Sequence, residues 1–315
     1  MNKTRILHVL DYFFVFRPTL FFPIWTIALV GAFAGQRQVG DYSPVGILST
    51  FIIFALYTLT FGAVYLINNI FDRENDAANG KVFLISDDFI PPAKAWSYLI
   101  ILLIVIFLLA FLHSIWLFYW LLGIFLVSGV AYSVRPIALK DRAYGSLAIN
   151  IASGFALFAF GWQLYAPFDG IHVWWHAVPY VLAWVATSIL TTIPDSSGDA
   201  EDDKHTIAVE LGHAKSQNIA YLLLLLALVF ALLTWDWVIL VSCLLAWPFY
   251  HRMWQTRSVA GTLRAIRWSI SFLSFTMFFV FPLYFLACFI VFFLARWYYR
   301  ERFDLNYPTW KVTPS

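Results

Sequence analysis

Most of the acidic residues in this chain fall into two short stretches. Of 18 Asp and Glu residues, 11 lie within residues 72–88 and 195–210. Both stretches repeat an oxygen-bearing side chain at every fourth position, the spacing that aligns side chains on one face of a helix. These form a first acidic row, Asn68, Asp72 and Asp76, and a second acidic row, Asp195, Asp199 and Asp203.

Two such rows predict a magnesium site. Mg²⁺ prefers oxygen ligands, binds proteins through a few carboxylates, and completes its coordination shell with water and phosphate oxygens. Two acidic rows facing each other would repel unless cations lay between them, and bridging Mg²⁺ ions would hold a diphosphate there. A pair of solvated acidic loops is the alternative, and it explains one row more easily than two matched ones.

Basic side chains near the rows could neutralise the diphosphate charge that the metal leaves. Some follow the rows closely, and others belong to a segment at 132–140 with the sequence YSVRPIALK. Each cation could equally be a charge that sets membrane topology, and the tyrosine could be an interface aromatic. The candidates for binding diphosphate are Arg73, Lys81, Tyr132, Lys140 and Lys204.

The composition predicts that membrane helices position these residues. Hydrophobic residues make up 62% of the 315 residues, charged residues only 12%, and the mean hydropathy is +0.76. A net charge of +2 with no basic stripe gives no reason to expect nucleic acid as a partner. Cys243 and Cys288 both lie in apolar runs, which excludes a CxxC metal site. We therefore expect one all-α, multi-pass membrane domain over residues 1–315.

Nine apolar stretches are long enough to cross a bilayer. With the amino terminus in the cytoplasm, 15 of the 20 basic residues fall in cytoplasmic segments, as the positive-inside rule requires. Both acidic rows then lie on the cytoplasmic side of the membrane, which we expect to be the cytoplasmic membrane. The basic carboxy terminus is an exception on the outside. The predicted spans are 13–35, 45–71, 95–113, 115–133, 144–166, 172–193, 218–235, 238–254 and 266–297.

At these residues the chain resembles the UbiA superfamily of intramembrane prenyltransferases. Members carry an NDxxDxxxD row after the second helix and a DxxxD row after the sixth, and several branches carry a YSxxPxxLK loop. The chain departs from the family pattern at Asn69, where the family often has Asp, and at Asp203, where it often has Gly. Only Lys81 remains of the basic pair that usually follows the first row.

The resemblance implies a bundle of nine transmembrane helices around a central cavity, with a cytoplasmic cap over the two rows. It also implies Mg²⁺-dependent transfer of a prenyl group from a prenyl diphosphate to a lipophilic acceptor, within membrane lipid. The metal would be held by Asn68, Asp72, Asp76, Asp195, Asp199 and Asp203, and the four inner carboxylates, Asp72, Asp76, Asp195 and Asp199, would be catalytic.

The sequence leaves the acceptor open. The YSxxPxxLK loop favours an aromatic quinone precursor or a chlorophyllide-like acceptor, while a carotenoid or a glycerol phosphate lipid suits the same diphosphate chemistry. Outside the family, the rows could bind the cation of a transporter. Transporter acids usually lie near the bilayer midplane on broken helices, whereas these acids lie at span ends beside basic residues.

Overall fold

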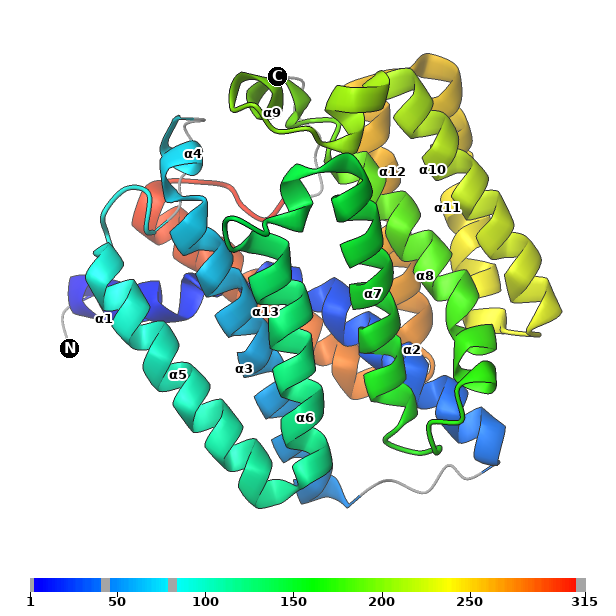
Figure 1. The fold of residues 1–315 in the computed structure, drawn as a ribbon, viewed down its shortest axis with the longest axis horizontal. Helices are drawn as coiled ribbons and strands as arrows, with labels where there is room; N and C mark the ends of the chain where they lie inside the picture. The colour runs from blue at the N-terminus through cyan, green and yellow to red at the C-terminus, as the bar shows by residue number, and fades with distance from the viewer. Residues whose placement is uncertain (1–2, 41–45, 79–83, 310–315) are drawn as a thin grey trace. The chain divides into compact units, whose positions relative to one another are not determined.

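Helices form all the regular secondary structure in the described part of the chain (Figure 1). The structure is a computed structural model and describes residues 3–40, 46–78 and 84–309. Cys243 and Cys288 are buried free thiols. The all-α prediction is therefore confirmed for these residues.

Seven helical segments of the described residues are long and apolar enough to cross a membrane, which makes the chain a multi-pass membrane protein. A shorter apolar segment, Ile115–Ala131, adjoins one of them. The seven segments are Ile6–Val39, Leu48–Phe71, Pro92–His113, Ala143–Trp162, Ile171–Thr191, Ile207–Leu233 and Pro282–Phe303.

The chain divides into two compact units, each assembled from separate parts of the sequence. Unit 1 comprises Met1–Phe22, Pro44–Leu139 and Phe289–Pro308. In it α3 packs against α5 and the π-helix η2, and α5 packs against α6. Its helices are α1 (Lys3–Phe14), η1 (Pro18–Leu20), α3 (Ile47–Phe71), α4 (Arg73–Ala78), α5 (Pro92–His113), α6 (Ile115–Ile124), η2 (Phe125–Ala131) and most of α13 (Pro282–Phe303).

Unit 2 comprises Pro23–Ser43, Lys140–Cys288 and Thr309–Ser315. Helix α8 is central to it and packs against α7, α10 and α12. The helices of this unit are α2 (Phe21–Val39), η3 (Leu139–Asp141), α7 (Ala143–Trp162), α8 (Ile171–Thr191), α9 (Ser196–Glu201), α10 (Ile207–Leu233), α11 (Trp237–Thr256) and α12 (Val259–Phe278).

Glycines let α2 and α7 approach closely in unit 2. A methyl group added at Gly161 would overlap the carbonyl oxygen of Ala28 and lie 2.7 Å from its carbonyl carbon. On the facing helix, a methyl group at Gly35 would lie 2.6 Å from the carbonyl oxygen of Trp162. Small residues allow such backbone contact between membrane helices. The crossing therefore depends on glycine at these positions.

The last predicted span, 266–297, is wrong as a single helix. Helix α12 ends at Phe278 and α13 begins at Pro282, because proline lacks an N–H and disfavours helical backbone in the residue before it. Two helices in place of one also change where the carboxy terminus lies.

The carboxy-terminal end of α13 lies beside α1 in unit 1. Arg302 binds Asp11 at 3.0 Å and lies over the ring of Phe89, 4.8 Å from its centroid. Asp88, next in the chain to Phe89, accepts a hydrogen bond from Arg73, which directly follows Asp72 of the first acidic row. The predicted exception to the positive-inside rule is therefore wrong, because the basic tail shares the end of unit 1 that carries α1 and the first row.

Asp11 is the centre of this contact between the two ends of unit 1. Its side chain is only 2% exposed, and it accepts hydrogen bonds from Tyr298 Oη at 2.6 Å and from Arg302 Nε and Nη2 at 3.1 and 3.0 Å. The ring of Tyr298 also stacks on Phe14 with centroids 3.7 Å apart. A buried carboxylate is stable only when it is paired and hydrogen-bonded in this way.

We expect Asp11→Ala to lower the free energy of unfolding by about 3 kcal/mol, because it leaves the largely buried Arg302 charge without its carboxylate. Thermal unfolding in detergent measures the effect. Asp87→Ala, at an exposed aspartate in the same unit, is the control and should change stability little. Equal melting temperatures for the two variants would contradict the pairing.

Candidate active site

The first acidic row lies where α3 ends and α4 begins. The main-chain N–H of Asp72 donates to Asn68 O at 2.9 Å, and that of Asp76 donates to Asp72 O at 2.8 Å. Helical register therefore continues along the row, although Asp72 itself has non-helical dihedrals (φ −91°, ψ 1°) and separates two helices. The four-residue alignment is confirmed, and the expectation of one unbroken helix is wrong at Asp72.

The side chains of this row form a connected polar group. Asn68 Nδ2 donates to Asp72 Oδ2 at 2.9 Å and to Ser133 Oγ at 3.0 Å. The amide thereby orients one carboxylate and joins it to a different helix. Asp76 is only 6% exposed, which is unusual for an aspartate at a helix end. The row is thus a partly buried set of oxygen-bearing side chains and not a solvated loop.

Ser133 reaches Asn68 through an irregular helix. The π-helix η2 ends at Ala131, and Tyr132 and Ser133 follow it directly. A π-helical turn rotates the following side chains relative to an α-helix and is frequent at functional sites. The structure thus brings the start of the YSxxPxxLK segment to the first row within unit 1. Ser133 was missed as a site residue, although its neighbour Tyr132 was chosen.

Of the two predicted cations that follow the first row, Arg73 and Lys81, the structure describes only Arg73. Arg73 Nη2 donates to Asp88 Oδ1 at 3.0 Å, and both side chains are substantially exposed, at 38% and 65%. Such exposed pairs contribute little to stability, so exchanging Asp88 for a phosphate group would cost little. Lys81 lies outside the described residues.

The second acidic row begins as predicted and then leaves the helix. Asp195 is the N-cap of α9, and the N–H of Asp199 donates to Asp195 O at 2.9 Å. Helix α9 ends at Glu201, and Asp203 has a left-handed backbone (φ +56°) with a fully exposed side chain. The predicted alignment of three aspartates on one helical face is therefore wrong for Asp203.

Lys204 folds back onto the second row. Its main-chain N–H donates to Asp199 O at 2.9 Å, and its Nζ lies 3.8 Å from Asp199 Oδ1 and 3.9 Å from Asp202 Oδ2. The lysine is only 9% exposed. A buried ammonium beside a partly buried carboxylate keeps a positive charge next to the second row.

Lys140 directly precedes two residues, Asp141 and Arg142, whose backbones contact His205 just after the second row. The N–H of His205 donates to Asp141 O at 2.9 Å, and Arg142 and His205 form an isolated backbone bridge. The His205 side chain also pairs with Glu210 at 2.6 Å. Residues 140–142 are thus tied to the end of the second row within unit 2. Sequence reasoning passed over Arg142 and His205, whose roles depend on this long-range pairing.

The left-handed backbone at Asp203 predicts that glycine is tolerated there. Glycine adopts positive φ without a steric penalty, whereas Asp tolerates it at some cost. We expect Asp203→Gly to keep or raise the melting temperature and to change turnover less than about tenfold, because its exposed side chain contributes little. Asp199→Asn is the comparison and should lose far more activity. An equal loss in both variants would give Asp203 a full role in the row.

Neither acidic row by itself supplies a complete set of protein ligands for a magnesium ion. Among the residues that the structure describes, no three His, Cys, Asp or Glu side chains lie close enough together to hold a metal. The first row nevertheless places an amide and two carboxylates in register, and the second places two carboxylates beside a lysine. These are hard oxygen donors, few in number, which suit an ion that keeps several waters and takes phosphate oxygens.

Comparisons with known proteins agree on one family. The model of the UbiA prenyltransferase family matches residues 24–273. A UbiA homologue from Archaeoglobus fulgidus bound to DMAPP and Mg²⁺ is similar in structure, with a TM-score of 0.64 and 15% identity over 85% of this chain and 99% of its own. No curated protein sequence matches this chain.

Two further solved structures share the fold. An apo UbiA homologue from Aeropyrum pernix K1 has a TM-score of 0.60 and 17% identity, over 86% of this chain and 96% of its own. A structure described as digeranylgeranylglyceryl phosphate synthase in membranes has a TM-score of 0.62 and 16% identity, over 86% of this chain and 98% of its own. At such low identity these structures establish the fold alone.

Proposed function

Since this chain belongs to the UbiA prenyltransferase family, we propose that it transfers a prenyl group from a prenyl diphosphate to a lipophilic acceptor in a Mg²⁺-dependent reaction within the membrane. The observation that carries the proposal is the polar group of the first row, where Asn68 orients Asp72 and binds Ser133. The homologue from Archaeoglobus fulgidus that binds DMAPP and Mg²⁺ supports the same donor chemistry.

The proposal assigns metal binding to both acidic rows and diphosphate binding to the neighbouring cations. Bound Mg²⁺ would act as a Lewis acid on the leaving diphosphate. Asn68 holds Asp72 in one orientation, Lys204 adds positive charge beside Asp199, and Arg73 exchanges its exposed partner Asp88 for phosphate. Lys81, Tyr132 and Lys140 complete the proposed diphosphate set, and Asp76 and Asp195 complete the metal set. Asp203 is the outermost proposed ligand because its side chain is fully exposed.

The chain's apolar interior would protect the reaction. Loss of diphosphate from an allylic carbon leaves a carbocation that water would trap, so the cavity must exclude water. We propose that residues 1–315 act as one membrane domain, a bundle of spans with a central cavity and a cap over the two rows. The amino terminus and both rows would lie on the cytoplasmic side of the cytoplasmic membrane, as the basic residues indicate.

The acceptor is proposed to be an aromatic quinone precursor or a chlorophyllide-like molecule. The YSxxPxxLK segment supports this choice, since it occurs in branches with such acceptors. A carotenoid or a glycerol phosphate lipid is the alternative within the family.

An assay with purified protein in lipid nanodiscs tests the function. Prenyl diphosphates of several chain lengths are incubated with a panel of acceptors and Mg²⁺, and both diphosphate and prenylated product are measured. We expect product that depends on Mg²⁺ and disappears with EDTA. Cation flux in proteoliposomes without consumption of any prenyl diphosphate would instead identify a transporter.

A further inference from the structure

Helix α9 carries two aspartates of the second acidic row, but none of its side chains is buried. It has six residues, Ser196–Glu201, with Asp195 as its N-cap and Asp199 in its first turn. A helix this short is unstable in water by itself, because its few hydrogen bonds do not offset the cost of ordering the chain. The contacts at its two ends must therefore fix its place in unit 2.

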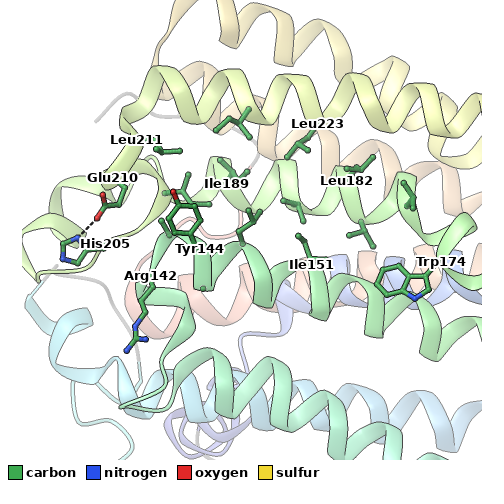
Figure 2. A pocket seen from close by; sticks show the side chains of 18 residues that line it. Arg142, Tyr144, Ile151, Trp174, Leu182, Ile189, His205, Glu210, Leu211 and Leu223 are labelled. Carbon is green, nitrogen blue, oxygen red and sulfur yellow. Dashed lines mark hydrogen bonds and ion pairs between the residues drawn. The ribbon is translucent and has the colours of Figure 1, made fainter. Parts of the chain in front are cut away.

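The connection that follows α9 holds its carboxy-terminal end. Lys204 donates its main-chain N–H to Asp199 O at 2.9 Å and has its ammonium nitrogen 3.8 Å from Asp199 Oδ1. The next residue, His205, donates its main-chain N–H to Asp141 O and pairs with the Glu210 side chain, as Figure 2 shows for that pair. These contacts tie the end of α9 to the segment before α7 and to the first turn of α10.

A hydrogen bond between Ser196 and His213 holds the other end of α9. Ser196, the first residue of the helix, has its Oγ 2.7 Å from His213 Nε2, and it donates a hydrogen bond to Ile193 O at 2.9 Å. A hydroxyl has a single proton to donate, so His213 Nε2 is the donor to Ser196. Ile193 is only 1% exposed. The serine thus connects a buried residue before the row to a histidine after it.

His213 lies in a braced turn of α10. Gly212 interrupts that helix with dihedrals (φ +76°, ψ +161°) that residues with side chains rarely adopt, and His213 follows it directly. Gly212 O accepts a hydrogen bond from Ser216 Oγ at 2.9 Å. On the other side of His213, Ala214 O accepts one from Arg257 Nη1 at 3.1 Å. The imidazole is therefore presented from a backbone that is bound on both sides.

We propose that His213 is a positioning residue of the second acidic row: by donating to Ser196 it fixes the start of α9, and with it the directions of Asp195 and Asp199. This rests on the proposed function, in which both aspartates bind Mg²⁺. His213 acts through α9 and not on the metal, since its Nε2 is directed to Ser196. Residues that orient metal ligands contribute about ten- to a hundredfold to metal affinity or activity. We expect about tenfold here, because the effect passes through a serine and a short backbone segment.

The Mg²⁺ dependence of turnover tests the proposal in full-length protein in lipid nanodiscs. His213→Ala should raise the Mg²⁺ concentration for half-maximal turnover about tenfold and leave the melting temperature within a few degrees of the parent. His213→Gln keeps an N–H donor at a similar reach and should restore most of the loss. His172→Ala is the matched control and should behave as the parent does. His172 is also exposed and makes a similarly short hydrogen bond, 2.6 Å to Asp169, but it lies at the end of α8 remote from the row.

A double-mutant cycle tests whether the effect passes through Ser196. Because Ser196→Ala removes the acceptor of His213, adding His213→Ala to it should shift the Mg²⁺ dependence no further. Shifts that multiply in the double variant would overturn the proposal, since the two residues would then act independently. A loss of active protein in His213→Ala with unchanged Mg²⁺ dependence would overturn it too, since the histidine would then serve stability alone.

Binding of Mn²⁺ distinguishes this proposal from the proposed function. Mn²⁺ takes the same kinds of oxygen ligand as Mg²⁺, and electron paramagnetic resonance measures its binding with inorganic diphosphate present and without turnover. We expect His213→Ala to bind Mn²⁺ about tenfold more weakly than the parent protein and His172→Ala to bind it equally well. If the parent forms no prenylated product while this difference holds, the proposed function fails and the positioning role stands. If the parent is active and His213→Ala binds Mn²⁺ as the parent does, the positioning role is overturned and the function stands.

Discussion

Asp72→Asn is expected to lower turnover at least about 10³-fold while leaving the protein folded. Asp72 is the middle member of the first row, and its Oδ2 accepts the hydrogen bond from Asn68 Nδ2. The substitution replaces a charged oxygen ligand with a neutral amide of the same shape. A metal that stabilises the leaving diphosphate contributes several kcal/mol, and about 4 kcal/mol corresponds to a factor of about 10³.

Two measurements separate loss of chemistry from loss of fold. Turnover is measured with saturating prenyl diphosphate over a range of Mg²⁺ concentrations, and thermal unfolding is measured in the same detergent. Asp72→Asn should fail to recover at high Mg²⁺ and should melt within a few degrees of the parent protein. Asp87→Asn, an exposed aspartate of unit 1 outside the row, should retain activity. Near-normal turnover by Asp72→Asn would exclude the row as a metal site.

Ser133 offers a graded version of the same test. Its hydroxyl accepts from Asn68 Nδ2, which also donates to Asp72, so Ser133 positions the amide and does not itself reach the metal in this proposal. Ser133→Ala should lower turnover less than loss of a proposed metal ligand does. We expect a loss of about ten- to a hundredfold, which is usual for residues that orient metal ligands. The dependence of turnover on Mg²⁺ should shift with it, which a purely structural role would leave unchanged.

The short-range features of the site could be predicted from sequence. Spacing of four residues placed Asn68, Asp72 and Asp76 in one helical register, and the main-chain hydrogen bonds confirm it. That pattern is local, because helix geometry alone determines which side chains align. The turn at the end of the second row also has a local signal. The family often has glycine at the position of Asp203, and Asp203 has the positive φ that glycine adopts freely.

The features that were missed depend on contacts between distant parts of the chain. Tyr298 and Arg302 lie 287 and 291 residues from Asp11 along the chain, and no local pattern links them. Counting α12 and α13 as one span therefore placed the basic tail on the wrong side. Pro282 was a usable signal, since a proline inside a 32-residue apolar stretch predicts a break. Ser133 and His205 likewise gain their roles only from partners on other helices.

Glycines show that a helix can pack closely, but they do not identify its partner. In α7, Gly154 and Gly161 leave room for a neighbour, and a Trp184 ring atom lies 2.9 Å from a methyl group built at Gly154. The partner helix was not foreseen, although Gly31 and Gly35 have the four-residue spacing of a small-residue packing motif. Sequence spacing shows that a helix has a smooth face, but it does not show which helix packs there.

Gly161→Leu is expected to abolish folding of the protein in the membrane. A methyl group at this position already overlaps the Ala28 carbonyl oxygen and lies 2.9 Å from Ala32 N, and both atoms belong to the backbone of α2. Backbone atoms of a helix cannot rotate away as a flexible side chain can, so the whole of α2 must shift. Overpacking of a core by a few methylenes costs about 1–3 kcal/mol even where side chains can adjust, and the rigid contact here raises that cost.

Gly123→Ala provides the matched control for this expectation. Gly123 is also a helical glycine, in α6, but within the described residues no atom beyond its chain neighbours and its own helix backbone lies within 4 Å of a methyl group built on it. Alanine there should leave stability unchanged or raise it by up to about 1 kcal/mol, because it restricts the unfolded chain and favours the helix. Yield of monodisperse protein and thermal unfolding in detergent measure both variants. If Gly161→Leu folded as well as Gly123→Ala, α2 and α7 could not cross with their backbones in contact, and the packing of unit 2 around α7 would have to differ from that described.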